Sequence, residues 1–417
     1  MHAFHRPAIL ALLLASSLPV LAQNPVPDPA DPVARLVGQL DLDRYKATIK
    51  SLTRFGDRRQ GTERNRKAID WIEAQLQSYG CATERIRYDF KPAPRPAGPR
   101  PVPPGGRAGP GGQGGSTLFG TRGPIGVNEN PMLQPDERLR ALNAEQPAPE
   151  GGPREEVVCT KVGSTRPDEM YIVAAHMDGM GYGEAANDDG SGTALVMELA
   201  RILNAPGVTT ERTIRFALWN NEETGLNGAA AYVNQRKDAQ GIESPKGSGK
   251  YPEPRWLGMI QHDMMMYDHG MPVAQVGADG KPRLDAKGQP LATPGPLQRR
   301  EADVNVEFQA NARFADEAQK LAWTLRLANE KYASRYPAAV GPHMTNTDST
   351  PFMDLVPAIS VRENERGMQI GAGWNPHWHQ PTDVYANFSD DDFLLGLNAA
   401  QTTLAAVAQL AGAHVAQ

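Results

Sequence analysis

The stretch of residues 171–192, YIVAAHMDGMGYGEAANDDGSG, constrains the fold of this chain more than any other. The β-branched and apolar run at its start is typical of a strand buried on both faces of a parallel sheet. His176 and Asp178 follow this run directly, which is where an α/β protein presents ligands at the carboxyl end of a strand. The Asn/Asp/Gly/Ser cluster at 187–192 then predicts a turn that opens a helix over 192–203.

The rest of the chain alternates between expected strands and expected helices. Apolar runs predict strands at 83–90, 156–162, 170–175, 213–219, 256–261 and 358–362. Periodic apolar positions predict helices at 63–79, 192–203, 225–236, 315–332 and 393–410. This order predicts an α/β fold in which a mostly parallel mixed sheet is flanked by helices on both faces.

The N-terminal residues predict export. An apolar run after Arg6 ends in the small-residue pattern Val20-Leu21-Ala22, so residues 1–22 have the form of a secretory signal peptide, followed by a polar leader at 23–35. We therefore expect a periplasmic or secreted protein. No later segment approaches 18 apolar residues, so no membrane span is expected, and the formal net charge of -5 gives no reason to expect nucleic acid as a partner.

Two further features bear on the organisation of the chain. Residues 91–116 are dense in Pro and Gly, which predicts a flexible insertion without chemistry of its own, and a weakly structured stretch is expected to continue to Pro153. Cys81 and Cys159 are too few for a zinc cage, so any metal must be held by His and carboxylate side chains. Whether these two residues form a disulfide or remain buried thiols is open.

More acidic residues and one more histidine follow other expected strands. Glu222 and Glu223 come shortly after the strand at 213–219, and adjacent carboxylates are costly in an interior unless one binds a cation and the other acts as a general base. Asp263 follows the strand at 256–261. His379 lies in a loop, and Asp383 stands four residues further on, where its carboxylate could orient the imidazole ring. Carboxylates and two imidazoles together suit two Zn²⁺ ions that share a bridging carboxylate and a water.

In these motifs the chain resembles the M28 family of zinc-dependent exopeptidases, which includes bacterial leucyl aminopeptidases and glutamate carboxypeptidase. The family pattern H-x-D, G-A-x-D-N/D-x-S-G, E-E, strand-end D and H-x-P-x-D is met by residues 176–178, 185–192, 222–223, 263 and 379–383. The resemblance implies a zinc exopeptidase, phosphorylase/hydrolase-like α/β/α sandwich. It also implies one peptidase domain over 36–412, with the insertion at about 91–153.

The resemblance also implies a metal-ligand set. His176 and Asp263 would hold one zinc, Glu223 and His379 would hold the other, and Asp188 would bridge the two. The spacing to the proline and aspartate favours His379 over the nearby His377 as the ligand.

Further roles follow from the same resemblance. Glu222 would be the general base, and Asp178 would stand behind His176 and fix its tautomer. Asp189, the neighbour of the bridging aspartate, is expected to face solvent or the start of the helix.

Two positions depart from the family. Ala185 stands where the bridging-aspartate motif usually has a glycine, which is a small change. Several family aminopeptidases carry a tyrosine that helps to hold the oxyanion four residues before an aspartate that corresponds to Asp348, and this chain has Met344 there. We expect His343 or a tyrosine elsewhere, such as Tyr336, to take this role.

The activity that the resemblance implies is peptide hydrolysis by a metal-bridging hydroxide. An aminopeptidase that releases N-terminal residues is the first expectation. A carboxypeptidase or dipeptidase of the same family, an enzyme like glutaminyl cyclase, and an inactive binding module are the alternatives. Peptides are the expected substrates, and the sequence leaves the preferred residue and the oligomeric state open.

Overall fold

The computed structural model describes residues 30–92, 130–145, 150–268, 302–333, 335–342, 347–363 and 375–416, with residues 28, 128 and parts of 275–291. Within these residues, a mixed sheet of eight strands has the order β1-β2-β5-β3-β6-β9-β7-β8. The central neighbours β5, β3, β6 and β9 are parallel to one another, whereas β1, β2 and β7 are joined by antiparallel pairings. The predicted signal peptide and the segment 93–127 lie outside the described residues.

The strands in chain order are β1 (Ala82–Phe90), β2 (Gly152–Lys161), β3 (Arg166–His176), β4 (Val208–Thr210), β5 (Arg212–Trp219), β6 (Arg255–His262), β7 (Val304–Phe308), β8 (Ala338–Gly341), β9 (Ala358–Glu363) and β10 (Ala413–Val415). The α-helices are α1 (Pro32–Val37), α2 (Leu42–Leu52), α3 (Glu63–Ser78), α4 (Glu137–Glu145), α5 (Gly190–Leu203), α6 (Asn227–Arg236), α7 (Ala315–Tyr332) and α8 (Asp390–Ala411). Four short 3-10 turns complete the described elements: η1 (Thr53–Phe55), η2 (Pro131–Leu133), η3 (Thr350–Phe352) and η4 (Tyr385–Asn387).

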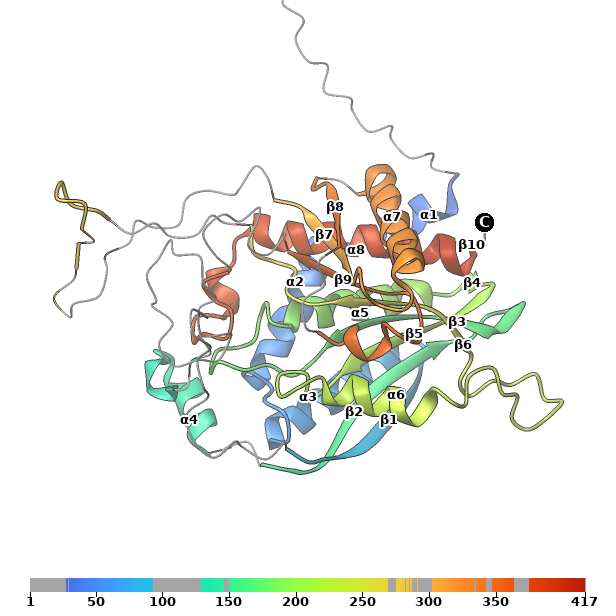
Figure 1. The fold of residues 1–417 in the computed structure, drawn as a ribbon, viewed down its shortest axis with the longest axis horizontal. Helices are drawn as coiled ribbons and strands as arrows, with labels where there is room; N and C mark the ends of the chain where they lie inside the picture. Colours follow the sequence, from blue (N-terminus) through green and yellow to red (C-terminus); the bar gives the residue numbers. More distant parts are fainter. Residues whose placement is uncertain are drawn as a thin grey trace, which may run out of the picture.

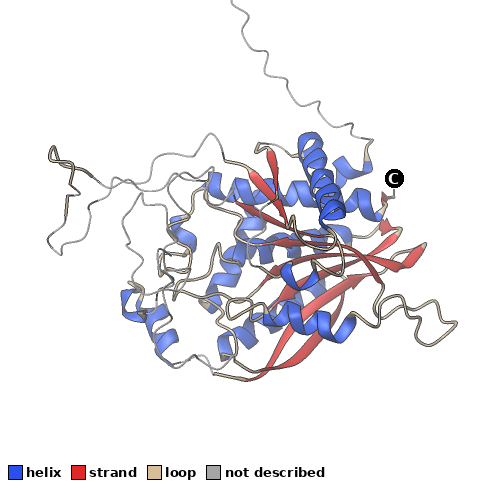
Figure 2. Cartoon of the chain, in the orientation of Figure 1, coloured by secondary structure: helices blue, strands red, loops and turns tan. Residues whose placement is uncertain are grey.

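Both faces of the sheet are covered (Figures 1 and 2). Side chains of β3 alternate between two cores, since Val173 and Ala175 pack in the larger one and Ile172 and Ala174 in the smaller one. The larger core includes residues of α1, α2, α3, α5, α7 and α8, and the smaller one includes α6 and η3. A strand buried on both faces needs a continuous apolar run, which explains the pattern from which β3 was predicted.

The fold confirms the predicted α/β class, and the predicted strands and helices form with small shifts in their ends. The helix α8 begins with a reciprocal capping box formed by Ser389 and Asp392. This helix is long and apolar enough to cross a membrane by length and composition, but 78% of its most apolar window is buried, as in a core helix. Cys81 and Cys159 form a disulfide that links the α3–β1 turn to β2.

Several elements were not predicted. The strands β7 and β8 extend the sheet beyond β9, and α1 begins at Pro32, within the expected leader. The stretch before Pro153 was expected to be weakly structured, but it contains η2 and α4. Leu139 of α4 is only 1% exposed, so this helix packs against the domain.

Candidate metal and catalytic site

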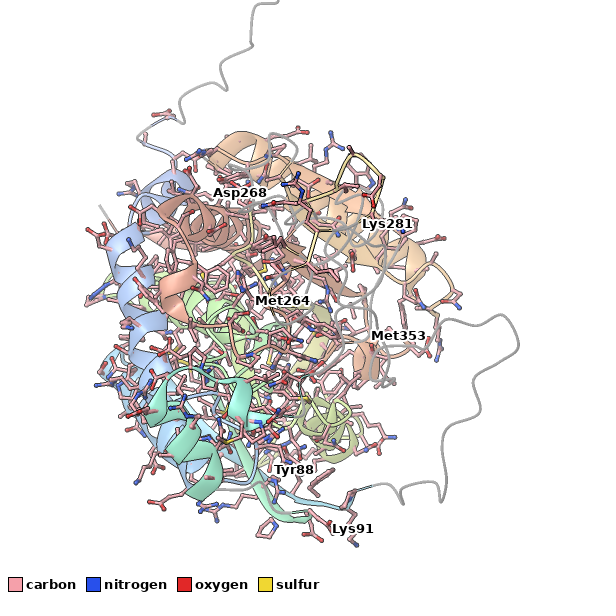
Figure 3. All side chains as sticks on the ribbon, turned by 90° about the vertical axis from the view of Figure 1, so that its left-hand side faces the viewer. Tyr88, Lys91, Met264, Asp268, Lys281 and Met353 are labelled. Atoms are coloured by element: carbon pink, nitrogen blue, oxygen red, sulfur yellow. A yellow bond between two sulfur atoms is a disulfide. The ribbon has the colours of Figure 1, made fainter. Side chains whose placement is uncertain are left out.

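Four parallel strands end at the same edge of the sheet, and the candidate site lies there. His176 is the last residue of β3, Asp263 directly follows β6, and Glu222 and Glu223 lie in the turn after β5. In Figure 3, which looks at this side of the molecule, Met264 lies near the centre of the face, and it is the residue after Asp263.

The structure brings all the predicted ligands into two adjoining groups. His176, Glu222 and Asp263 form one group, and Asp188, Glu223 and His379 form the other; within each, one ligand atom per residue lies within 4.8 Å of the others.

Asp188 joins the two groups. Its Oδ1 atom lies 3.3 Å from Nε2 of His176, and its Oδ2 atom lies 3.2 Å from Nε2 of His379. A carboxylate that offers one oxygen to each side is suited to bridge two cations. The remaining contacts in the groups are His176 Nε2 to Asp263 Oδ1 at 3.8 Å and His379 Nε2 to Glu223 Oε2 at 2.8 Å.

The charges of the site are interdependent. Burial alone would lower the pKa of His176, but the carboxylates of Glu222, Asp188 and Asp263 raise it well above its usual value. Burial likewise opposes the shift at His379, where Glu223 and Asp188 raise the pKa to about 10. The two imidazoles in turn lower the pKa of Asp188 to about 2, against the effect of its own burial.

The acidic side of the site shows the opposite shift. Burial raises the pKa of Glu223 to about 7 and the pKa of Glu222 well above its usual value, and neighbouring carboxylates add to both shifts. Asp348, carried by the turn before η3, is fully buried, and burial raises its pKa strongly as well. Neither carboxylate oxygen of Asp348 has a hydrogen-bond partner among the described residues.

This donor set fits two zinc ions. Buried carboxylates without cations are costly, and the excess of carboxylates over imidazoles leaves negative charge that divalent cations would compensate. Oε1 of Glu223 has no hydrogen-bond partner among the described residues, so it is free to coordinate. Imidazole nitrogen and carboxylate oxygen are the ligands that zinc takes in catalytic sites.

The structure places the two predicted orienting aspartates differently from the prediction. Nδ1 of His176 lies 2.9 Å from the backbone carbonyl oxygen of Asp178, while the Asp178 carboxylate is 3.8 Å away and accepts from the backbone N–H of Glu222. Thus the backbone of Asp178 fixes the ring of His176, and its side chain fixes the turn of the two glutamates.

Among the described residues, Asp383 does not orient the ring of His379 by a hydrogen bond. Its carboxylate accepts hydrogen bonds from the backbone N–H groups of Asn187 and Asp188, at 2.9 and 3.1 Å. It therefore holds the bridging carboxylate's own backbone. Nδ1 of His379 has no hydrogen-bond partner among the described residues.

Asp189 faces the start of the helix, one of the two predicted environments, and it is fully buried. It caps α5 by accepting from the backbone N–H of Gly192, and it also accepts from those of His176 and Met264. One carboxylate thus joins the ends of β3 and β6 to the first turn of α5.

Three buried residues that hold the site were missed by the sequence analysis. Arg362 of β9 places Nη2 2.9 Å from Oδ2 of Asp263. Glu363 accepts from the side-chain amides of Asn187 and Asn375, so it connects the Asp188 turn to the loop of His379.

The third is Arg58, whose guanidinium donates to the carbonyl oxygens of Met177, Glu184 and Ala185. It thereby orders the loop between the H-x-D motif and the bridging aspartate. Its signal in the sequence was only an arginine in the segment before α3.

The group that assists the oxyanion is not identified. The hydroxyl of Tyr336 is engaged elsewhere. It donates to Oδ2 of Asp268 at 2.6 Å, lies 3.1 Å from the carbonyl oxygen of Asp391, and forms no hydrogen bond with a predicted ligand among the described residues. His343 lies outside the described residues. His262 contacts the carbonyl oxygen of Ala174 and Thr403, and His377 contacts Thr382, so neither belongs to the two ligand groups.

With this geometry established, comparison with known proteins decides the family. The sequence model of peptidase family M28 matches residues 156–400, which include every residue of the two ligand groups. The chain belongs to peptidase family M28. It is thus a member of a metallopeptidase family, and the resemblance read from its motifs is confirmed.

Individual relatives of this M28 chain carry different activities in their names. The probable lipoprotein aminopeptidase LpqL of Mycobacterium tuberculosis is 27% identical over 254 residues, which are 59% of this chain and 43% of LpqL. Carboxypeptidase Q of Xenopus laevis is 37% identical over 76 residues, 18% of this chain and 16% of that protein. The matched regions span less than half the length of either relative.

Among solved structures, the aminopeptidase from Aneurinibacillus sp. strain AM-1 has a similar fold. The two superpose with a TM-score of 0.57 at 18% sequence identity, covering 92% of this chain and 97% of that one. This likeness concerns the fold alone, and it agrees with the α/β architecture described above.

Proposed function

We propose that this protein is a zinc-dependent aminopeptidase that uses two zinc ions to release N-terminal residues from peptides. The observation that carries the proposal is the meeting of two ligand groups at Asp188, with Glu222 beside them. These groups come from strand ends, from the turn before α5 and from the loop of His379, which are far apart in the sequence. The aminopeptidase names of LpqL and of the Aneurinibacillus enzyme favour the N-terminal end of the substrate.

The roles of the chain's residues follow from their positions. His176 and Asp263 would hold one zinc, Glu223 and His379 the other, and Asp188 would contact both. When bound, two zinc ions lower the pKa of a water and stabilise negative charge on the carbonyl oxygen of the scissile bond.

Glu222 would perform the proton transfers. It takes a proton from the attacking water as the water oxygen bonds to the peptide carbonyl carbon, and it then gives that proton to the leaving nitrogen as the C–N bond breaks. A general base works best when its pKa is near the operating pH, and burial raises the pKa of Glu222 above that of a free glutamate.

We also propose that the protein is exported, with residues 1–22 as its signal. The disulfide between Cys81 and Cys159 supports this proposal, since such bonds persist in the periplasm and outside cells. Peptide mapping of the protein recovered from culture medium and periplasm tests it. A mature N-terminus near residue 23 is expected, and recovery only from the cytoplasm with residues 1–22 intact contradicts export.

One experiment separates the candidate activities. The mature protein is incubated with a peptide in free and N-acetylated forms, with and without a chelator, and the products are followed by mass spectrometry. Stepwise loss of N-terminal residues from the free form alone, abolished by the chelator, is expected. Loss from the carboxyl end identifies a carboxypeptidase, and loss of ammonia from an N-terminal glutamine identifies a cyclase. An unchanged peptide set contradicts the proposal.

A further inference from the structure

The described residues between the Pro/Gly-rich stretch and β2 make direct contacts with the loops of the candidate site. We use the name clasp for Asn128 and residues 130–145. The backbone N–H of Asn128 donates to the carbonyl oxygen of His379 at 3.0 Å. The side-chain Nε2 of Gln134 donates to the carbonyl oxygens of Tyr182 and Pro381, both at 2.8 Å. The clasp therefore contacts the backbone of a predicted zinc ligand, the rest of that ligand's loop at Pro381, and the loop of Tyr182.

Gln134 is built into the protein rather than laid on its surface. Its side chain is 1% exposed, and besides donating to the two carbonyl oxygens it accepts from the backbone N–H of Asp136 through Oε1. A buried amide with its donors and acceptor all engaged has one favourable orientation. Loss of the donors would leave two carbonyl oxygens without these hydrogen bonds.

The two loops that Gln134 joins are themselves in close contact. A Cβ atom added to Gly181 would lie 2.3 Å from the backbone carbonyl carbon of His379, so only glycine permits this approach. The backbone N–H of Glu184 also donates to the carbonyl oxygen of Asp383, at 2.7 Å. Movement of the Tyr182 loop would therefore be transmitted to His379.

The other end of the clasp is anchored to the N-terminal helices. Leu139 is buried, and Arg64 of α3 donates to the carbonyl oxygen of Leu142 and to the side chain of Asn143. Arg138 pairs with Glu184 at 3.1 Å, on the same loop as Tyr182. In Figure 3, α4 lies on the face turned to the viewer, below and to the left of Met264, which agrees with a position beside the site.

We propose that the clasp is a positioning segment for His379, and that it sets the affinity of the zinc position formed by Glu223 and His379. This inference rests on the proposed two-zinc function. The zinc position of His176 and Asp263 is held by strand ends, by the carbonyl of Asp178 and by Arg362, and within the described part of the chain the clasp forms no hydrogen bond or ion pair with any of these. The two positions should therefore respond differently when the clasp is weakened.

The test is the variant Gln134→Glu. It keeps an oxygen to accept from Asp136, but it replaces the two donating hydrogens with a carboxylate oxygen that faces two carbonyl oxygens. Gln77→Glu is the matched control, because Gln77 is exposed and its amide donates to the side chain of Thr83. Calorimetric titration of the metal-free full chain with zinc measures both binding steps. His176→Ala and His379→Ala assign each step to its position.

We expect Gln134→Glu to weaken the step assigned to Glu223 and His379 by about 10- to 100-fold, as is typical when a group behind a metal ligand is removed. The other step should stay within about twofold of the wild type, and Gln77→Glu should leave both unchanged. Equal loss at both positions, or no loss at either, overturns the proposal.

The experiment separates a failure of the proposed function from a failure of the clasp proposal. A wild-type chain that binds no zinc contradicts the two-zinc function itself, whereas a wild type that binds two zinc ions and a variant that binds them equally well contradict only the clasp. If Gln134→Glu does not fold by circular dichroism, Gln134→Met removes the donors without adding charge and is read by the same criterion.

Discussion

The two candidate zinc positions are built from different parts of the fold. His176 and Asp263 extend from adjacent parallel strands, β3 and β6, whose backbones are fixed by the sheet. Glu223 lies in a turn, and His379 lies in a loop where its φ of 53° is in the left-handed region. The first position is stabilised by its neighbours in the sheet, and the second depends on contacts with segments distant in sequence.

This difference shows how many supporting contacts each kind of metal ligand needs. A strand-end ligand needs a sheet, which any α/β protein has, plus one partner behind it, such as Arg362 behind Asp263. A loop ligand needs several holders, and here Asn128, Gln134 and Glu363 all contact the segment 375–383. The loop position therefore depends more than the strand-end position on contacts from outside the sheet.

The largest effect is expected from Asp188→Ala, because Asp188 is common to both positions. Loss of the shared carboxylate should abolish zinc binding at both positions, remove measurable peptidase activity and abolish the stabilisation that added zinc gives to the wild type. Zinc content by atomic absorption, together with thermal unfolding with and without added zinc, checks this. A variant that keeps two zinc ions per chain would show that Asp188 is not the bridge.

The next effect is expected from Glu222→Gln, which tests chemistry apart from binding. Gln keeps the size of the side chain but cannot take a proton, so kcat should fall by about 10²- to 10⁴-fold. Zinc content should remain that of the wild type, because Glu222 is proposed as a base and not as a ligand. Measured kcat near the wild-type value would refute the general-base role, and loss of zinc would make Glu222 a ligand.

The site residues at the strand ends, such as His176 and Asp263, could be predicted from the sequence for a simple physical reason. A strand buried on both faces needs an apolar run, so the polar residues that end the run stand out, and parallel strands bring their carboxyl ends together. The same signal was present at Arg362-Glu363, which end the apolar strand β9, but charged residues there were not read as part of the site.

The residues that hold the loop of His379 could not be recognised from the sequence in this way. Gln134 lies in a polar stretch of short elements, and its partners at Tyr182 and Pro381 are backbone carbonyls, which carry no side-chain identity. Contacts of this kind depend on the path of the loops. The expectation of a weakly structured stretch was wrong here because a few apolar residues, Leu139 above all, suffice to dock a short helix on a preformed domain.

A change at Arg362 should mainly weaken the zinc position that His176 and Asp263 form at the strand ends. Arg362→Met keeps much of the side chain's length but leaves Oδ2 of Asp263 without its buried cation, so zinc binding by His176 and Asp263 should weaken by about 10- to 100-fold. Arg326→Met on α7 is the control, since Arg326 pairs with Glu330 on the surface. Equal binding in all three proteins would assign Arg362 no role in holding Asp263.

The pH dependence of zinc binding tests the zinc position formed by Glu223 and His379. In the metal-free protein burial raises the pKa of Glu223 to about 7, and Glu223 and Asp188 raise that of His379 to about 10. Both groups must lose their protons to bind zinc, so affinity should rise with pH, by about 100-fold per unit below pH 7 and about tenfold per unit between pH 7 and 10. Titrations over this range check the slope, and a pH-independent affinity contradicts it.

The raised pKa of Glu223 also determines the direction in which the stability of the metal-free protein changes with pH. The pKa of Glu223 is higher in the folded state than in the unfolded state, so the folded state binds more protons between about pH 4.5 and pH 7. The contribution of Glu223 to stability is therefore greatest below the unfolded value and is lost as the pH rises through 7. Zinc should reverse this trend, because it replaces the proton.

The smallest effect on catalysis is expected from Tyr336→Phe, which tests a residue whose hydroxyl donates to groups outside both zinc positions. The hydroxyl of Tyr336 is held by Asp268 and Asp391, so its removal should lower the free energy of unfolding by about 1–3 kcal/mol and leave kcat within about twofold of the wild type. Tyr332→Phe is a matched control, because the Tyr332 hydroxyl likewise donates to a carboxylate, that of Asp31, at 2.8 Å. A large fall in kcat with unchanged stability would return Tyr336 to the reaction. Retention of kcat would instead leave the oxyanion to the proposed zinc ions and to groups nearer to Asp188, in keeping with a site whose proposed ligands lie at the strand ends, in the turn before α5 and in the loop of His379.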